Sequence, residues 1–182
     1  LSLRVRSGSD ARLEAELLLS HSLELTRTQL YAQMTRPATE EEQARFETFL
    51  QRRLAGEPTA YIIGKVEFFG LELVVNRAVL IPRPETEQLV EVTLQELTGK
   101  RRDSVPAGGW RIADVGCGSG AIAVALAVHL PNATVYAIDA SPATLEVARQ
   151  NCERHAVAVR VVLLEGDLLS PLPERVHAIV AN

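Results

Sequence analysis

The stretch that decides the fold is "IADVGCGSGAIAVALA", residues 112–127, in which three glycines separate an apolar run from an alanine-rich run. Gly116, Gly118 and Gly120 allow a tight turn and let a ligand approach the backbone closely. The N-terminus of the helix that follows favours polar or anionic groups. The pattern predicts a strand, a glycine turn and a helix with a ligand at the turn; the alternative is an ordinary turn without a ligand.

Strand-like and helix-like runs alternate around this turn. Strands are predicted over residues 110–115, 134–138, 157–164 and 176–181, and helices over residues 119–130 and 142–155. Because the links are short, the crossovers should be right-handed and the sheet mostly parallel. The fold class is therefore α/β, with a Rossmann-like parallel sheet.

The chain before this alternation is predicted to be a small helical bundle over about residues 8–56. Leucines recur at helical spacing in residues 10–25, and the segments "TRTQ" and "TEEE" match the capping box that opens helices. The segment "AYIIGKVEFFGLELVVN", residues 60–76, predicts a β-hairpin because it is rich in β-branched and aromatic residues and contains two glycines. A helix is expected over about residues 85–97, and the polar residues 98–109 are the best candidate boundary.

Composition limits the classes of function. Apolar residues make up 47% of the chain, which is ample for a packed core. The net charge is -4 and the pI about 5.6, which argues against a general nucleic-acid-binding surface. Cys117 and Cys152 are too few for a disulfide framework and lack the spacing of metal ligands, so no metal is expected and a reducing cytoplasm is the simplest location. No apolar run is long enough to span a membrane.

Two carboxylates indicate which ligand the turn binds. Asp139 ends the next strand, 23 residues after Gly116, where it would accept both hydroxyls of a ribose. The glycine spacing alone also permits NAD. Asp114 favours S-adenosylmethionine instead, because a carboxylate near the turn repels a pyrophosphate but attracts an ammonium group, directly or through water.

The segment "EGDLLS", residues 165–170, follows the third predicted strand. Asp167 would lie near the adenine and accept from its amino group, and Leu168 would cover the face of the ring. The alternative is a structural turn, since Gly-Asp is common in turns.

These segments together resemble the HemK/PrmC family of class I methyltransferases, the peptide chain release factor glutamine methyltransferases. The resemblance covers nearly the whole chain. It rests on the helical segment "DARLEAELLLSHSLELTRTQLY", the segment "RRLAGEPTAYIIGKVEFFGLELVVN", the signature "LIPRPETEQLVE" and the loop "DVGCGSGAIAVALA". It implies a helical substrate-recognition domain over residues 1–58, a hairpin linker over 59–80 and a partial S-adenosylmethionine-binding domain over 81–182.

The resemblance also implies the activity and the site. The family transfers a methyl group from S-adenosyl-L-methionine to the glutamine amide nitrogen, N5, of the Gly-Gly-Gln motif in release factors. The methionine part of the cofactor would be held by Gly116, Cys117, Gly118, Ser119 and Gly120. Arg83 and Thr86 would line the methionine end of the cofactor. The alternative is that Pro82 and Pro84 simply stiffen a linker and that Thr86 caps a helix. Asp139 would take the ribose, and Asp167 and Leu168 the adenine, but the family often has an aromatic residue where this chain has Leu168.

The last segment, "RVHAIVAN", residues 175–182, is a predicted strand followed by Asn182. The resemblance implies that Asn182 is the catalytic and substrate-binding Asn of an Asn-Pro-Pro-Tyr motif, whose oxygen accepts an N–H group of the substrate glutamine. Pro-Pro-Tyr is absent. We therefore expect that C-terminal strands are missing, that this chain binds cofactor weakly at best, and that activity requires the missing part.

Release factors are the expected partners, with no direct nucleic-acid contact and no membrane. Three alternatives remain open. The first is an exocyclic-amine methyltransferase acting on DNA or RNA, which a basic face would favour. The second is a non-catalytic cofactor-binding module, and the third is an NAD-dependent oxidoreductase, which Asp114 disfavours.

Overall fold

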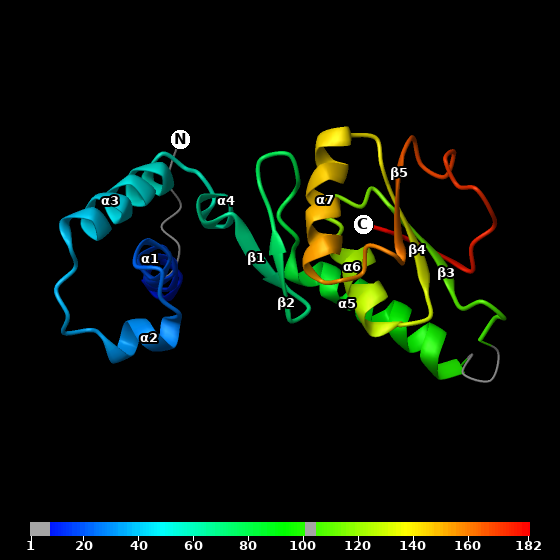
Figure 1. Cartoon of the computed structure of the whole chain (residues 1–182), viewed down its shortest axis with the longest axis horizontal. Coiled ribbons are helices and arrows are strands. Elements are labelled where there is room, and N and C mark those ends of the chain that lie inside the picture. The colour runs from blue at the N-terminus through cyan, green and yellow to red at the C-terminus, as the bar shows by residue number, and fades with distance from the viewer. Residues whose placement is uncertain (1–7, 101–104) are drawn as a thin grey trace. The chain divides into compact units, whose positions relative to one another are not determined.

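The computed structural model describes residues 8–100 and 105–182, and the chain divides between Gly64 and Lys65 into two compact units. The first unit is helical (Figure 1). Its helices are α1 (Gly8–Ser22), α2 (Arg27–Ala32), α3 (Glu40–Leu54) and α4 (Thr59–Ile63). α1 packs against the other three, and Leu18 and Ile62 are buried. The predicted helical bundle is confirmed.

Both predicted capping boxes are present. Thr26 accepts from the backbone N–H of Gln29, and Thr39 accepts from that of Glu42. In return, the side chain of Gln29 or Glu42 accepts a hydrogen bond from the backbone N–H of the capping threonine. Two backbone N–H groups that lack a partner within the helix are thus satisfied at each helix start. The bounds of α2 and α3 are therefore encoded locally.

The predicted hairpin begins later than expected. Residues 60–63 belong to α4, which follows Pro58 and ends at Gly64, whose left-handed backbone (φ 80°) closes the helix. Burial of Ile62 within the helical unit outweighs the strand preference of this segment. The hairpin itself is β1 (Lys65–Phe68) and β2 (Leu71–Val74), which pair antiparallel.

The second unit contains a four-stranded, fully parallel sheet with the order β5-β4-β3-β6. The strands are β3 (Arg111–Val115), β4 (Thr134–Asp139), β5 (Val161–Glu165) and β6 (Ala178–Ala181). Helix α6 (Ala121–His129) connects β3 to β4, and α7 (Pro142–Arg154) connects β4 to β5. The predicted α/β fold and parallel sheet are confirmed.

Several boundaries differ from the prediction; among them, the strand predicted over residues 176–181 is β6, which starts at Ala178. β5 starts at Val161 rather than at residue 157, because residues 157–160 form a turn in which the N–H of Arg160 donates to the carbonyl of Val157. The helix expected over 85–97 is α5 (Pro84–Gln95), which continues into a π-helical turn, η1 (Glu96–Lys100). Residues 98–109 are not a boundary between units, since residues 65–182 form one unit; residues 101–104 of that segment lie outside the described residues.

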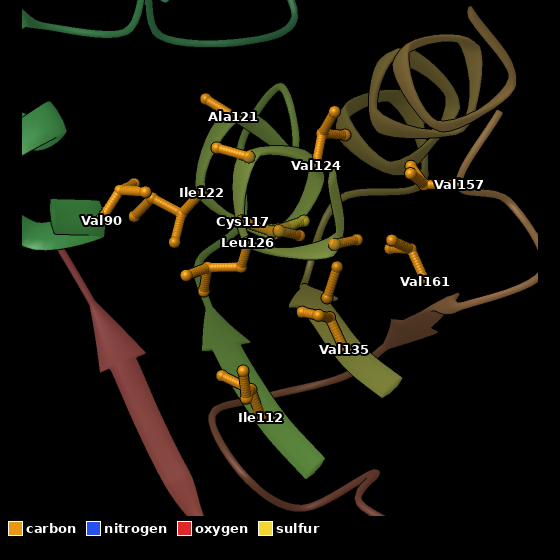
Figure 2. Close-up of a cluster of buried hydrophobic side chains, with 14 of the residues drawn as sticks. Val90, Ile112, Cys117, Ala121, Ile122, Val124, Leu126, Val135, Val157 and Val161 are labelled. Carbon is orange, nitrogen blue, oxygen red and sulfur yellow. The ribbon is translucent and has the colours of Figure 1, made fainter. Parts of the chain in front are cut away.

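The core of the second unit is built around α6, whose residues 121–127 are all buried. α6 contacts α5 and α7 and packs on β4, and α7 packs on the hairpin strand β2. Figure 2 shows the side chains of Ile122 and Val90 facing each other between α6 and α5, with Ile112 and Val135 on the sheet side. An alanine-rich helix suits this central position because it presents little bulk to any neighbour. Among the described residues, no helix is long and apolar enough to cross a membrane.

Candidate functional site

The strand order creates a crevice between β3 and β6. From β3 the chain moves outward through β4 to β5, and then returns to the opposite side of β3 as β6. In open α/β sheets, ligands bind outside the carboxyl ends of the strands where the direction of strand addition reverses. Val115 pairs with Ala181, so the glycine turn and Asn182 leave the sheet side by side at this point.

A cavity of about 460 Å³ lies at this edge. It is within the size range of small-molecule sites, about 300–1,000 Å³. Seven residues predicted for the site line it: Arg83, Thr86, Gly116, Cys117, Gly118, Ser119 and Asn182. Six others also line it: Leu80, Ile81, Pro82, Glu85, Ala121 and Ile122. Residues far apart in the sequence thus meet at one cavity.

The glycine turn has left-handed backbone at all three glycines, with φ of 71°, 55° and 76° at Gly116, Gly118 and Gly120. A Cβ at Gly116 or Gly118 would meet no atom of the described part of the chain within 4 Å, so the space above these residues is open. A Cβ at Gly120 would lie 3.1 Å from the Cβ of Ala148, which shows close packing of the turn on α7. Gly120 is therefore required for both its backbone conformation and its lack of a side chain.

Asp139 fastens the turn to the end of β4. Its Oδ2 accepts from the N–H of Gly118 at 3.1 Å, and its Oδ1 accepts from the N–H of Ser141 at 3.0 Å. Its backbone carbonyl accepts from the N–H of Gly166, which follows β5. Asp167 is exposed just beyond, and Leu168 is 65% exposed with a left-handed backbone (φ 49°). The predicted ribose and adenine residues therefore follow neighbouring strands at the same edge of the sheet.

Five of the predicted cofactor residues are described but do not line the cavity: Asp114, Gly120, Asp139, Asp167 and Leu168. Asp114 lies beneath the turn and is only 1% exposed. Its Oδ2 accepts a hydrogen bond from the N–H of Ala123 at 3.0 Å, in the first turn of α6, whereas its Oδ1 has no hydrogen-bond partner among the residues that the structure describes. Desolvation raises the pKa of Asp114 to about 7, an effect that the hydrogen bond from Ala123 opposes and the charge of Asp139 reinforces.

Cys117 contributes its backbone to the cavity and its side chain to the core. The residue is 6% exposed and belongs to the buried hydrophobic cluster shown in Figure 2. Burial, together with the charges of Asp114 and Asp139, raises the pKa of its thiol. A protonated, buried thiol is a poor nucleophile, so Cys117 acts as a small packing residue.

The segment "RPETE", residues 83–87, places each residue differently. Arg83 occupies the N-cap position of α5 without a side-chain cap, and Pro84 opens the helix. Glu85 lines the cavity, and Thr86 accepts from Asn182 Nδ2 at 2.7 Å. Glu87 Oε1 accepts from the backbone N–H of Phe69 in the hairpin turn. The alternative that Thr86 caps the helix is therefore wrong.

Asn151 on α7 is a residue that reasoning from the sequence missed. It is fully buried, and its amide both accepts from the N–H of Val74 (2.6 Å) and donates to that residue's carbonyl (2.9 Å). It also donates to the carbonyl of Ser119 at 2.8 Å, which ties the glycine turn to strand β2. The helix is polar along much of its length, so nothing in the sequence sets Asn151 apart from its exposed neighbours. Among the described residues there is no group of three or more His, Cys, Asp or Glu that could hold a metal ion.

Two family descriptions match the chain. Residues 112–182 match "Methyltransferase domain", which with the parallel sheet and glycine turn defines the second unit as a class I methyltransferase domain. Residues 2–64 match "PrmC N-terminal domain". The chain therefore belongs to the HemK/PrmC family.

Curated relatives support this membership. The release factor glutamine methyltransferase of Moorella thermoacetica is 45% identical over 172 residues, which cover 94% of this chain and 58% of the relative. That of Chlorobaculum tepidum is also 45% identical, covering 88% of this chain and 54% of the relative. The enzyme of Geobacter sulfurreducens is 44% identical, and the match covers 95% of this chain and 57% of the relative. The chain thus spans somewhat more than half the length of these relatives.

Proposed function

We propose that the protein carrying this chain is an S-adenosyl-L-methionine-dependent methyltransferase. It acts in the cytoplasm on the glutamine of the Gly-Gly-Gln motif in peptide chain release factors and methylates its amide nitrogen, N5. The observation that carries the proposal is the cavity where the glycine turn, the RPETE segment and Asn182 meet. The names of the curated relatives supply the substrate class.

The residues present fit this cofactor. The methionine part of the cofactor is a short chain of atoms that must lie against the protein backbone. The open space above Gly116 and Gly118 accommodates it. The buried carboxyl group of Asp114, whose pKa is about 7, is about half ionised at neutral pH, and its ionised form would favour an ammonium group over a phosphate. We assign Asp139, at the end of β4, to the ribose hydroxyls and Asp167, after β5, to the adenine amino group, because these neighbouring strands end at one edge of the sheet.

When bound, the cofactor supplies an electrophilic methyl group on a sulfonium sulfur. The glutamine nitrogen is a weak nucleophile because its lone pair is delocalised into the carbonyl. Residues 116–119 would hold the methionine part of the cofactor, which would supply its methyl group to this nitrogen while sulfur keeps the carbon–sulfur electron pair and water takes the nitrogen's proton. Asn182 accepts an N–H of the substrate amide and aims its lone pair, so positioning rather than a general base provides the catalysis.

The two units divide the work. Residues 1–58 recognise the release factor, residues 59–80 connect, and residues 81–182 hold the cofactor. Their helical and α/β architectures support this division, since a cavity suited to the cofactor lies entirely within the second unit.

The test is transfer of label from the methyl-labelled cofactor to a purified bacterial release factor. The 182-residue chain and any longer form of the protein are assayed side by side, with a release factor whose motif glutamine is replaced by alanine as control. We expect label only on the unsubstituted release factor. Labelling of the alanine variant, or of DNA or RNA in parallel reactions, would contradict the proposed substrate, and calorimetric preference for NADH would contradict the cofactor.

A further inference from the structure

The side-chain amide of Asn182 is held by the first turn of α5. Asn182 Nδ2 donates to Thr86 Oγ1 at 2.7 Å. Thr86 is only 7% exposed, whereas Asn182 lies at the exposed mouth of the cavity. The buried threonine is thus the fixed partner in this contact, and the asparagine side chain is the one whose orientation the contact can set.

Thr86 itself is rigidly placed. It follows Pro84, which has a fixed φ, and its backbone N–H donates to the carbonyl of Arg83 at 3.0 Å. Its branched side chain has few rotamers within a helix. The next residue, Glu87, accepts from the N–H of Phe69 at 2.7 Å and so fastens the same helical turn to the hairpin. The hydroxyl therefore occupies a defined position beside the end of β6.

The backbone leading to Asn182 is fixed by the sheet. The three residues before it pair with β3, from Ile179 opposite Ala113 to Ala181 opposite Val115. Asn182 itself follows the strand, and the contact with Thr86 restrains its side chain. An amide whose NH₂ group is engaged presents its oxygen, an acceptor, on the opposite side.

We propose that Thr86 is a positioning residue that fixes which end of the Asn182 side-chain amide faces the substrate. This inference rests on the proposed function. The substrate glutamine nitrogen carries two N–H donors and needs an acceptor. With Nδ2 bonded to Thr86, Oδ1 of Asn182 remains as that acceptor. If the Asn182 side-chain amide were rotated by 180°, its NH₂ group would face the N–H groups of the substrate glutamine. Methyl transfer would then stop, although the cofactor would still bind.

Three variants test this inference. Thr86→Val removes the hydroxyl with little change in shape, and Thr86→Ser keeps it. Thr93→Val is the matched control, because Thr93 lies on the same helix, outside the cavity lining, and donates to the carbonyl of Leu89. Thermal unfolding of all three verifies that the fold is retained.

The first measurement follows the Asn182 side-chain amide by ¹⁵N NMR in the 182-residue chain, with assignment from Asn182→Asp. In the parent and in Thr86→Ser we expect hydrogen exchange of this NH₂ group to be slow. In Thr86→Val we expect it to be accelerated, while Thr93→Val leaves it unchanged. Equal exchange in the parent and Thr86→Val would overturn the inference, whether or not the protein methylates glutamine.

The second measurement is methyl transfer by whichever form of the protein is active. For Thr86→Val we expect kcat to fall roughly 10- to 100-fold, the scale of a misplaced catalytic group, with recovery of most of the rate in Thr86→Ser. Cofactor affinity should stay within about threefold of the parent, because the lost interaction acts in the transition state. A parallel loss of cofactor affinity would make Thr86 a cofactor ligand instead. If the parent methylates no glutamine, the proposed function fails, and the NMR result still decides the contact.

Discussion

The buried carboxyl group of Asp114 makes the stability of the second unit depend on pH. The perturbation is Asp114→Asn, which keeps an oxygen to accept from the N–H of Ala123 but cannot titrate. In the folded chain the pKa of Asp114 is about 7, against an ordinary value of 3.8. At pH values between these two pKa values, Asp114 is protonated in the folded state and has lost its proton in the unfolded state. Stability contributed by this group is therefore full below pH 4 and is lost as pH rises through 7.

The magnitude follows from the two pKa values. They differ by about 3, and each pKa unit corresponds to about 1.4 kcal/mol, so the parent should lose about 4 kcal/mol relative to Asp114→Asn between pH 4 and pH 8. About 1.4 kcal/mol of this loss should fall between pH 6 and pH 8. The amide adds a buried NH₂ group where Oδ1 has no partner within residues 8–100 and 105–182, which gives a pH-independent penalty of about 1–3 kcal/mol. The variant should thus be less stable than the parent in acid and gain relative to it as pH rises.

The assay is urea unfolding at a series of pH values, followed by tryptophan fluorescence. Trp110 is the single tryptophan of the chain and is 5% exposed in the core of the second unit, so its signal reports on the unit that contains Asp114. Asp167→Asn, an exposed carboxylate after β5, controls for the change in net charge. A difference in unfolding free energy between parent and Asp114→Asn that is constant with pH would refute the assignment of a raised pKa to this group.

Three further predictions concern the site. Gly120→Ala should destabilise the second unit by about 1–2 kcal/mol because the backbone there is left-handed, with a further loss from the close approach to Ala148, and should abolish cofactor binding. Urea unfolding would measure the stability and calorimetry the cofactor affinity; if neither changed, the packing described would be contradicted. Asn151→Leu should lower the unfolding free energy by about 3 kcal/mol or more, because it leaves the N–H and carbonyl of Val74 unpaired; a loss below about 1 kcal/mol would refute that role. Asn182→Ala should retain cofactor affinity and lose methyl transfer, and activity near that of the parent would exclude Asn182 from catalysis.

Much of the fold could be predicted because the relevant signals are local. The capping boxes at Thr26 and Thr39, and the glycine turn after β3, each define an element boundary within a few residues. The hairpin boundary was wrong because helix α4 depends on burial of Ile62, a contact that residue preferences do not contain. The predicted start of β5 was wrong for a similar reason, since the turn over residues 157–160 is closed by a backbone hydrogen bond within a segment whose valines favour a strand.

The candidate site was only partly predictable. The cavity-lining residues in the glycine turn stand out because glycine has conformations that other residues avoid. Glu85 was missed within a motif that had already been recognised, since nothing in the sequence indicates which side chains of a helical first turn face a cavity. Asn151 was missed because an asparagine in a helix gives the same local signal whether it is exposed or buried.

The sequence by itself determined the α/β class, the position of the glycine turn, the carboxylates at the strand ends and the family resemblance, because these depend on periodicity and on residue types within short windows. Only the tertiary structure decided that Asp114 is buried beneath the turn, that Thr86 contacts Asn182, and that Asn151 joins β2 to the turn. Thr86 and Asn182 are 96 residues apart, and Asn151 and Val74 are 77 apart. Such contacts arise from parallel strand order and helix packing, which bring distant segments to one edge of the sheet.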